Sequence, residues 1–574
     1  MPGTHHGMRN KLWTRPLSSV ECVYRRGGHH APELRRRTPA CTKAVLPEQM
    51  WSKAMTEYHE TIVVGGGFGG ICAAHGLLEE GRGDFVILER AGELGGVWRD
   101  NRYPNAACDV PAHFYSLSFA PNPTWTRSYA PWDEILAYIN KVADDLGVRD
   151  RIRFHTTLVS ANWDELAGVW NLRTAVGTSL SCRFLVMASG SLSTPRVPDL
   201  PGRETFRGEV IHTADWDERV SLEGRRVVVV GASASAAQVL PYAVDVAESV
   251  LAVIRTPPYV MPKDEQFYDV EAQARFRDEP ERMAVIRADA EHRFNVEADT
   301  QAVMDEAQLA EIEGQWRDYM ESEIGDAALR NLLTPSYRFG CRRPVISSTF
   351  YPALADRRTT VWSAGISSMT ATGVVADDGR EWDADVVVLA TGFIATDMYA
   401  GIEFYGESAR SLKADAWREA PHAYKGTVVA GFPNLFLVTG PHTQASGSII
   451  AVIEAQMKMI MQYIQLVDES GAVSVQPSPR AQQSFNDWVD SAMADSVWEA
   501  GGCHSWYRLG MAGKVVTKWP GSLASFQKMT STVDLGDLVL KFGQPGAPAL
   551  VASSVAAAPV AVEAGHSSTC HDLG

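Results

Sequence analysis

Short apolar runs alternate with polar, helix-like stretches along most of this chain of 574 residues. The runs are rich in valine, isoleucine and leucine, which is typical of strands buried in a parallel sheet. They occur at 61–64, 85–89, 182–190, 226–230, 250–255, 359–365 and 383–393. The alternation predicts an α/β fold, and the glycines that end two of the runs predict two Rossmann-like dinucleotide-binding domains.

The first run ends in a glycine-rich turn that opens a helical pattern. Gly65, Gly67 and Gly70 have the spacing GxGxxG, which allows a tight turn and lets the backbone approach a pyrophosphate at the helix N-terminus. Glu89 ends the next run, 24 residues after Gly65, where a carboxylate accepts hydrogen bonds from ribose hydroxyls. We interpret this unit as a site for FAD or NAD, with Phe68 as a further candidate contact. A glycine-rich turn without a ligand is the alternative.

A second unit has the opposite charge at its ribose end. Its valine-rich run breaks at Gly231, and Ser233 and Ala236 stand where further glycines would be. Arg255 follows Gly231 by 24 residues, and an arginine at this place binds a 2′-phosphate. The unit is therefore predicted to bind NADP, with Ser233 and Ser235 as candidate contacts. An ordinary buried βαβ unit with a surface arginine is the alternative. A flavin and NADPH on one chain indicate an NADPH-dependent flavoenzyme.

Changes of pattern along the chain predict its domains. Between two stretches of strand signals lies a charged, Ala- and Glu-rich region, which predicts a helical insertion. The predicted parts are a disordered basic extension (1–55), the first part of an FAD-binding domain (56–200), an NADP-binding domain (201–382) with the insertion at about 263–333, the second part of the FAD-binding domain with a C-terminal cap (383–544), and a flexible tail (545–574). For the basic extension, a targeting leader or a start at Met50 or Met55 is the alternative.

Composition narrows the functional classes. A net charge of −16 disfavours a nucleic-acid partner, and no apolar run approaches the ~20 residues of a membrane span. None of the eight cysteines forms a CxxC pair, which disfavours a zinc site or a dithiol couple, so no metal is expected. The cysteines fit a reducing cytoplasm, where they serve mostly as small hydrophobic side chains. The sequence carries no feature that fixes an oligomeric state.

Two further segments carry a resemblance to a known family. GGVWRDNRYPNAACD (95–109) matches GGxWxxxxYPGxxxD, and FRGEVIHTADWD (206–217) matches FxGxxxHxxxWD. From about 56 to 530 the chain resembles the type I Baeyer–Villiger monooxygenases, which bind two dinucleotides. Asn105 replaces the usual glycine, but asparagine tolerates a left-handed backbone, so we expect the turn to survive. The matching residues are Gly95, Gly96, Trp98, Tyr103, Pro104 and Asp109 in the first segment, and Phe206, Gly208, His212, Trp216 and Asp217 in the second.

The resemblance also implies catalytic roles. In YRFGCRRPVISSTFYP (337–352), Arg343 corresponds to the family's catalytic arginine, which Asp109 orients, and Arg342 to the basic residue that helps to hold the NADP phosphate. The chemistry agrees, because a peroxide anion on flavin needs a fixed positive charge nearby, and arginine keeps its proton at neutral pH. A solvated basic pair before a proline is the alternative.

Other segments supply candidate contacts with the cofactors. GGCHSWYRLGMAGKVVTKWPGS (501–522) resembles the C-terminal segment of the 4-hydroxyacetophenone monooxygenase subgroup, which implies that Ser505 and Trp506 lie near the nicotinamide half of NADP. GPHTQASGSII (440–450) resembles the family's flavin-side turn. The second resemblance motif is interpreted as a conformational linker, with His212 as a structural residue. The remaining candidate cofactor contacts are Gly96, Trp98, Tyr103, Thr391 and Gly392.

The resemblance implies an FAD-containing, NADPH-dependent Baeyer–Villiger monooxygenase. Such an enzyme converts a ketone, with aryl or cyclic ketones favoured here, to an ester or lactone with O2 through a C4a-peroxyflavin. A flavin monooxygenase that oxidises sulfide or amine nitrogen is one alternative, which Trp216 and Asp217 disfavour. A pyridine nucleotide–disulfide reductase would need a CxxC motif. A flavin-binding protein that has lost oxygenation is the non-enzyme alternative, suggested by the altered second unit.

Overall fold

The structure is a computed structural model that describes residues 56–543. The extension predicted at 1–55 and the tail predicted at 545–574 lie outside the described residues.

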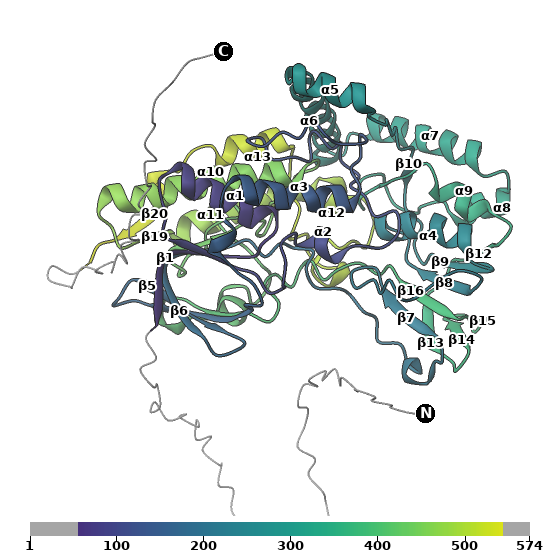
Figure 1. The fold of residues 1–574 in the computed structure, drawn as a ribbon, viewed down its shortest axis with the longest axis horizontal. Helices are drawn as coiled ribbons and strands as arrows, with labels where there is room; N and C mark the ends of the chain where they lie inside the picture. The colour runs from purple at the N-terminus through teal and green to yellow at the C-terminus, as the bar shows by residue number, and fades with distance from the viewer. Residues whose placement is uncertain (1–55, 544–574) are drawn as a thin grey trace, which may run out of the picture. The chain divides into compact units, whose positions relative to one another are not determined.

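The first strand of the described chain lies inside an eight-stranded sheet (Figure 1). The order is β17-β4-β5-β6-β1-β2-β3, and β18 also pairs with β6. Residues 61–64 of β1 and all of β2 are buried, which explains their nearly continuous apolar sequence. The strands are β1 (Glu57–Val64), β2 (Phe85–Leu88), β3 (Ile152–Arg153), β4 (Leu158–Asp164), β5 (Val169–Thr174), β6 (Ser179–Met187), β17 (Glu403–Tyr405) and β18 (Leu435–Leu437).

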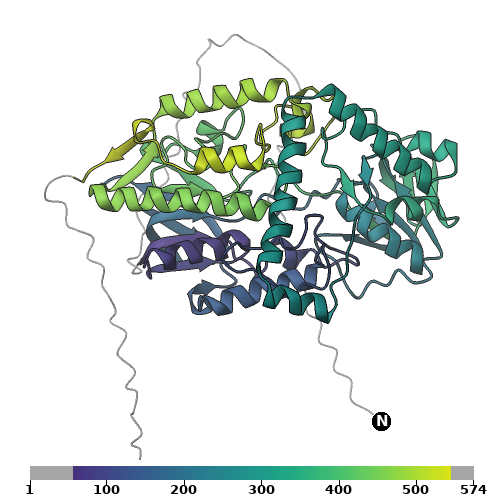
Figure 2. The same ribbon diagram turned by 90° about the horizontal axis from the view of Figure 1, so that it is seen from above.

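Helices from both ends of the described chain pack together beside this sheet (Figures 1 and 2). α1 (Phe68–Glu79) contacts β1, α3 (Trp132–Asp145) and α10 (Ile449–Ser470), and α10 contacts α13 (Leu523–Thr530). α10 is apolar on more than one face, because it is buried between α1 and α13. The first sheet therefore shares one apolar core with helices that follow it by hundreds of residues.

A second sheet is entirely parallel, with the order β12-β9-β8-β16-β7. Its strands are β7 (Glu209–His212), β8 (Arg226–Val230), β9 (Ser249–Val253), β12 (Thr359–Trp362) and β16 (Val386–Leu389). The helices α4 (Ala234–Val246) and α9 (Phe350–Ala355) pack together next to it. Three short two- or three-stranded sheets complete the described strands: β10 (Val260–Met261) with β11 (Val345–Ile346); β13 (Ile366–Met369), β14 (Gly373–Ala376) and β15 (Glu381–Asp383); and β19 (Ser474–Pro477) with β20 (Leu538–Lys541).

The run at 383–393 forms a strand of the second sheet. It is predicted to begin the second part of the FAD-binding domain, and its strand β16 pairs with β7 and β8. A buried parallel strand has the same continuous apolar sequence in either sheet, so this pattern does not reveal which sheet the strand joins. β16 thus belongs to the second sheet, and the domain boundary at 383 stays a prediction.

Helices occupy most of the stretch for which the sequence predicts an insertion: α5 (Val270–Asp278), α6 (Glu281–Ala302), α7 (Glu306–Glu323) and α8 (Ala327–Leu332). Asp269, Asp305 and Asp326 cap three of them by accepting hydrogen bonds from backbone N–H groups of the first turn. α6 contacts α13 and α12 (Val497–Ala500), so the insertion lies against the C-terminal part of the described chain. The other helices are α2 (Val97–Asp100) and α11 (Pro479–Ala494).

The prediction that the cysteines are reduced thiols is wrong for two of them. Cys341 and Cys503, 162 residues apart, form a disulfide whose Cα atoms are 6.0 Å apart. Two cysteines so far apart in sequence have no local spacing from which a disulfide could be predicted. Cys72, Cys108 and Cys182 are buried free thiols, as expected for small hydrophobic side chains. Within residues 56–543, no helix combines the length and the apolar character that crossing a bilayer requires.

Candidate active site

The first glycine-rich turn requires glycine on steric grounds. Gly65 has φ +114°, and a Cβ there would lie 2.5 Å from the carbonyl oxygen of Ala188. A Cβ on Gly70 would lie 2.0 Å from the carbonyl oxygen of Gly65. α1 begins at Phe68 with Gly67 as its N-cap, so the free N–H groups of its first turn lie at this turn. The backbone therefore fits a pyrophosphate, the use predicted for it.

Glu89 lies at the end of β2 beside the same turn, but its carboxylate already has protein partners. It is buried, and Oε2 accepts a hydrogen bond of 2.7 Å from the backbone N–H of Gly66. Oε1 accepts from Nη1 of Arg99 at 2.9 Å and from the N–H of Ala91 at 2.8 Å. Glu89 thus also fixes the turn itself. Arg99 was not singled out from the sequence, although its place in the GGVWRD segment was a signal.

The first segment that carries the family resemblance, 95–109, packs directly against this turn. The N–H of Gly95 donates to the carbonyl of Gly66 at 3.0 Å. A Cβ on Gly96 would lie 3.3 Å from the Cα of Gly67, so the two glycine turns are in contact. Trp98 donates through Nε1 to the hydroxyl of Tyr115 at 3.2 Å. The motif therefore brings Trp98 to the first nucleotide turn.

The same motif also reaches the second predicted nucleotide unit. The hydroxyl of Tyr103 hydrogen-bonds with Oε1 of Gln238 at 2.8 Å and with Oγ of Ser235 at 3.3 Å, and both partners lie on α4. Asn105, which replaces the family glycine, has φ +63°. The turn therefore keeps the left-handed backbone that we expected asparagine to tolerate.

The second turn repeats the geometry of the first at Gly231. Its φ is +134°, and a Cβ there would lie 2.3 Å from the carbonyl oxygen of Ala390, which follows β16. Ser233 is the N-cap of α4, and Ala236 is fully buried in place of the third glycine. The helix here makes room for a methyl group, whereas α1 does not.

The predicted phosphate-binding arginines lie near each other. Arg255 follows β9 and is exposed. Arg342 donates through Nη1 to the carbonyl of Thr256 at 3.4 Å, and its guanidinium lies 5.8 Å from the ring centroid of Tyr337. The structure thus brings two cations to the end of β9.

The second segment that carries the family resemblance, 206–217, contains β7, which lies next to β16. A Cβ on Gly208 would lie 2.4 Å from the carbonyl oxygen of Asp385 and 2.5 Å from the ring of Phe206, so glycine is required. His212 is buried, and its Nδ1 accepts from the N–H of Ala214 at 3.0 Å. Burial lowers the pKa of His212, which favours the neutral ring and fits a structural residue.

Four remaining candidates lie close to β7 and β16 in the chain. Trp216 packs against the core of the second sheet, and Asp217 accepts from Nε of Arg219 at 2.8 Å. Thr391 donates to the carbonyl of Arg196 at 2.5 Å, and Gly392 has φ +75°. These contacts are with the protein itself, and a role toward the cofactors stays a prediction.

Arg343 and Asp109, 234 residues apart, form a two-point ion pair. Nη2 of Arg343 donates to Oδ1 of Asp109 at 2.6 Å, and Nε donates to Oδ2 at 3.1 Å. The nearby carboxylate is the main cause that raises the pKa of Arg343 above its ordinary value. Arg343 directly precedes Pro344 and β11, whose pairing with β10 fixes the backbone. The contact expected between the two residues is therefore present.

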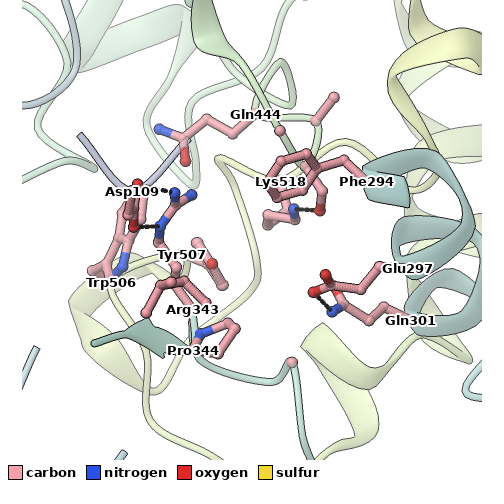
Figure 3. A pocket seen from close by; sticks show the side chains of 15 residues that line it. Asp109, Phe294, Glu297, Gln301, Arg343, Pro344, Gln444, Trp506, Tyr507 and Lys518 are labelled. Atoms are coloured by element: carbon pink, nitrogen blue, oxygen red, sulfur yellow. Dashed lines mark hydrogen bonds and ion pairs between the residues drawn. The ribbon is translucent and has the colours of Figure 1, made fainter. Parts of the chain in front are cut away.

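This ion pair lines a cavity whose wall also contains residues that are not among the candidates predicted from the sequence (Figure 3). Trp506 is in its wall, and its place near the nicotinamide half of NADP stays a prediction. Lys518 is in its wall too, and a single lysine within the apolar run VVTKW was the available signal. The other lining residues are Phe294, Glu297, Gln301, Gly340, Pro344, Ile346, Gln444, Ala445, Ser446, Gly447 and Tyr507.

The disulfide joins two segments of this cavity wall. Cys341 precedes Arg343 by two residues, and Cys503 precedes Trp506 by three. The cross-link therefore holds the arginine segment next to the C-terminal segment.

Comparisons with known proteins match this architecture. Residues 59–278 match the family described as "Flavin-binding monooxygenase-like". A Baeyer–Villiger monooxygenase of Streptomyces coelicolor is 40% identical over 514 residues, which are 89% of this chain and 97% of that protein. A Baeyer–Villiger monooxygenase of Pseudomonas aeruginosa is 35% identical over 84% of this chain and 91% of its own length.

Solved structures give the same result. Cyclohexanone monooxygenase from Rhodococcus sp. Phi1 bound to NADP+ has a TM-score of 0.76 and 27% identity, covering 85% of this chain and 100% of that one. An oxidised steroid monooxygenase bound to NADP has a TM-score of 0.75 and 28% identity, with the same coverage.

Fold and site thus define a flavin-dependent monooxygenase with two dinucleotide-binding domains. The chain belongs to the Baeyer–Villiger monooxygenase family. The fold, the enzyme class and the two cofactors predicted from the sequence, FAD and NADPH, are those of this family.

Proposed function

We propose that the protein inserts one oxygen atom of O2 next to the carbonyl of a ketone, with aryl or cyclic ketones favoured. The reaction balances as ketone + O2 + NADPH + H⁺ giving ester or lactone + NADP⁺ + H2O. The observation that carries the proposal is the two-point ion pair of Arg343 with Asp109 in the cavity wall of a chain with two nucleotide-binding turns.

FAD fits the first turn and NADPH the second. Gly65, Gly67 and Gly70 with the start of α1 would hold the FAD pyrophosphate, and a Cβ at Gly65 or Gly70 would clash with the backbone of the turn. Gly231 and the start of α4 would do the same for NADPH, with Arg255 and Arg342 on the 2′-phosphate. FAD held at the first turn would supply the redox chemistry, which is acceptance of hydride from NADPH and activation of O2.

Arg343 supplies a fixed positive charge in the cavity wall. Asp109 holds both Nε and Nη2, so the plane of the guanidinium is set before the substrate arrives. Such a preorganised charge stabilises negative charge that develops during oxygen transfer to a carbonyl. Trp506, in the same wall, would lie beside the nicotinamide half of NADP(H) and help to exclude water.

The two sheets suggest the domain assignment. We assign the sheet around β1, with the helices α1, α3, α10 and α13, to FAD, and the sheet around β8, now including β16, to NADPH. Tyr103 connects the two, because it follows the first turn in sequence and hydrogen-bonds to α4. The segment 206–217 would then act as a linker when the cofactors shift.

A ketone panel with the purified holoenzyme tests the proposal. NADPH oxidation and ester or lactone formation are measured together, and we expect them in a ratio near one for aryl or cyclic ketones. NADPH consumption that yields only hydrogen peroxide across the whole panel would contradict it.

Arg255→Ala tests the coenzyme assignment. We expect KM for NADPH to rise roughly 10- to 100-fold, because a charge-assisted contact with the phosphate is lost, and KM for NADH to change little. Arg380→Ala is the matched control, since Arg380 is a surface arginine paired with Asp378 in the β14–β15 hairpin. An equal effect of Arg255→Ala on both coenzymes would remove the phosphate contact from the proposal.

A cytoplasmic location stays a prediction. The described disulfide is a feature that oxidising compartments favour, whereas the three free buried thiols are compatible with either environment.

A further inference from the structure

Lys518 is fixed in the wall of the cavity by its backbone. The segment that carries it runs beside the turn at 442–444: the N–H of His442 donates to Val516 at 3.0 Å, and the N–H of Gln444 donates to Thr517 at 2.9 Å. Only 4% of the residue surface of Lys518 is exposed. Its position is therefore set by the fold and does not drift as a surface lysine would.

The ammonium group of Lys518 is held by few partners. Nζ donates one hydrogen bond of 3.1 Å to Oγ of Ser446. It lies 4.4 Å from the ring centroid of Trp498 and 5.6 Å from that of Tyr507. Among residues 56–543 no carboxylate forms an ion pair with it. An ammonium carries three donors, so two N–H groups remain for a ligand.

Within the described residues no charged group forms an ion pair with Lys518, although the carboxyl group of Glu297 offsets in part the effect of burial on the pKa of Lys518. Arg343 is already paired with Asp109. Glu297 faces the cavity from α6, across from Lys518 (Figure 3), and accepts a hydrogen bond of 2.7 Å from Gln301. Burial raises the pKa of Glu297, which favours its neutral form. Burial first, and Arg343 second, lower the pKa of Lys518 to about 7, so a bound anion would stabilise its charged form.

We propose that Lys518 selects ketones that carry a carboxylate: the ammonium binds the carboxylate while the ketone carbonyl lies toward Arg343. This inference rests on the proposed function and names its substrate class. The apolar rings of Phe294, Trp506 and Tyr507 line the same cavity and suit the carbon skeleton between the two polar ends. A neutral ketone brings no counter-charge to the ammonium, and a cationic ketone is repelled by it.

Matched pairs of aryl ketones test this selection. The substrates are 3-acetylbenzoate and 4-acetylbenzoate, each compared with its methyl ester, which has the same skeleton without the charge. We expect the holoenzyme to favour at least one acid over its methyl ester in kcat/KM by roughly 10- to 100-fold, the effect of one buried charge-assisted hydrogen bond. The preferred ring position reports the spacing between Lys518 and Arg343.

Two variants of Lys518 and one control variant test whether Lys518 causes the preference for the acid over its methyl ester. Lys518→Met keeps a long unbranched side chain without the charge and should bring the acid-to-ester ratio down toward one. Lys518→Arg keeps the charge and should keep a preference for the acid. Lys514→Met is the control, because Lys514 belongs to the same segment but is exposed and paired with Asp490 at 2.6 Å, so the ratio should not move.

The outcomes separate this inference from the proposed function. A wild type that oxygenates the methyl esters and rejects both acids overturns the inference alone. So does a Lys518→Met variant with the wild-type ratio. An enzyme that converts other ketones of the panel but none of these four also overturns the inference alone. Failure with every ketone tested, with hydrogen peroxide as the product, overturns both. The wild-type ratio requires no variant, so the test stands even where Lys518→Met does not fold.

Discussion

The two cations in the cavity wall, Arg343 and Lys518, hold their charges in different ways. Arg343 donates to both oxygens of Asp109, and this carboxylate raises its pKa. Lys518 has a hydroxyl and two aromatic rings as neighbours, and burial lowers its pKa to about 7. One charge is thus permanent and fixed in orientation, while the other depends on pH and on what enters the cavity.

This difference suggests a division of tasks. A group that stabilises charge in the transition state must be charged before each turnover, and a paired guanidinium meets that need. A group that recognises substrates gains selectivity when its charge is stabilised only by the correct ligand. The following predictions test whether the two cations differ in this way.

Substitution of Arg343 should have the largest effect, which is on the rate of ester formation. Arg343→Ala should lower the rate of ester formation by roughly 10²- to 10³-fold, the cost of removing one preorganised donor from a transition state, while NADPH still reduces the flavin. Stopped-flow absorbance measures flavin reduction, and product analysis measures the ester. Arg343→Lys keeps a charge but loses the two-point contact, so it should recover only part of the activity. Normal ester output from Arg343→Ala would end the proposed role.

Cleavage of the disulfide should loosen the wall that holds both cations. Cys341 lies next to Arg343 in sequence, and Cys503 begins the segment that leads to Lys518. Cys341→Ser with Cys503→Ser should lower the free energy of unfolding by about 2–4 kcal/mol, as typical for loss of a native disulfide. Urea unfolding with and without dithiothreitol measures this. The wild type should respond to the reductant and the double variant should not; equal insensitivity of both would contradict the cross-link.

Over a single pH unit, the smallest expected effect is the pH dependence that Lys518 adds to stability. Its pKa is about 7 in the folded protein, below the ordinary value of 10.5. The folded state therefore binds fewer protons than the unfolded state between these values, and stability rises with pH by about 1.4 kcal/mol per unit in this window. Below pH 7 both states are protonated and burial of the charge costs its full amount.

Comparison of wild type with Lys518→Met isolates this contribution, because the variant does not titrate at the position. The difference in free energy of unfolding should shift in favour of the wild type between pH 7 and pH 9. A difference that stays constant over this range would mean that Lys518 keeps its proton, and its charge would then be as permanent as that of Arg343.

Local patterns predicted the parts of the fold that depend on local geometry. Gly65 and Gly231 were recognisable because a strand must end in a turn that leaves no room for Cβ, and both turns have that geometry. Asn105 was recognised as a tolerated replacement, and its positive φ agrees. The pairing of Arg343 with Asp109 was accessible only through the family resemblance, since no local pattern relates residues 234 apart.

The parts that were missed depend on long-range packing. β16 reads as a buried strand in either sheet, and its assignment needed the hydrogen-bond register. The Cys341–Cys503 pair has no spacing signature. In the sequence, Lys518 is a single charged residue in an apolar run. Its place in a cavity wall depends on α6 and on the turn at 444–447, which line the same cavity.

The disulfide also determines what a protease can release. The loop that it closes includes the exposed hairpin turn at Asp378 and Gly379. A chain cut at this turn would remain one covalent molecule, with the two pieces migrating separately only after reduction. The disulfide would then keep the segment that carries Arg343 attached to the one that carries Lys518. A gel run without reductant would not show that the chain had been cut.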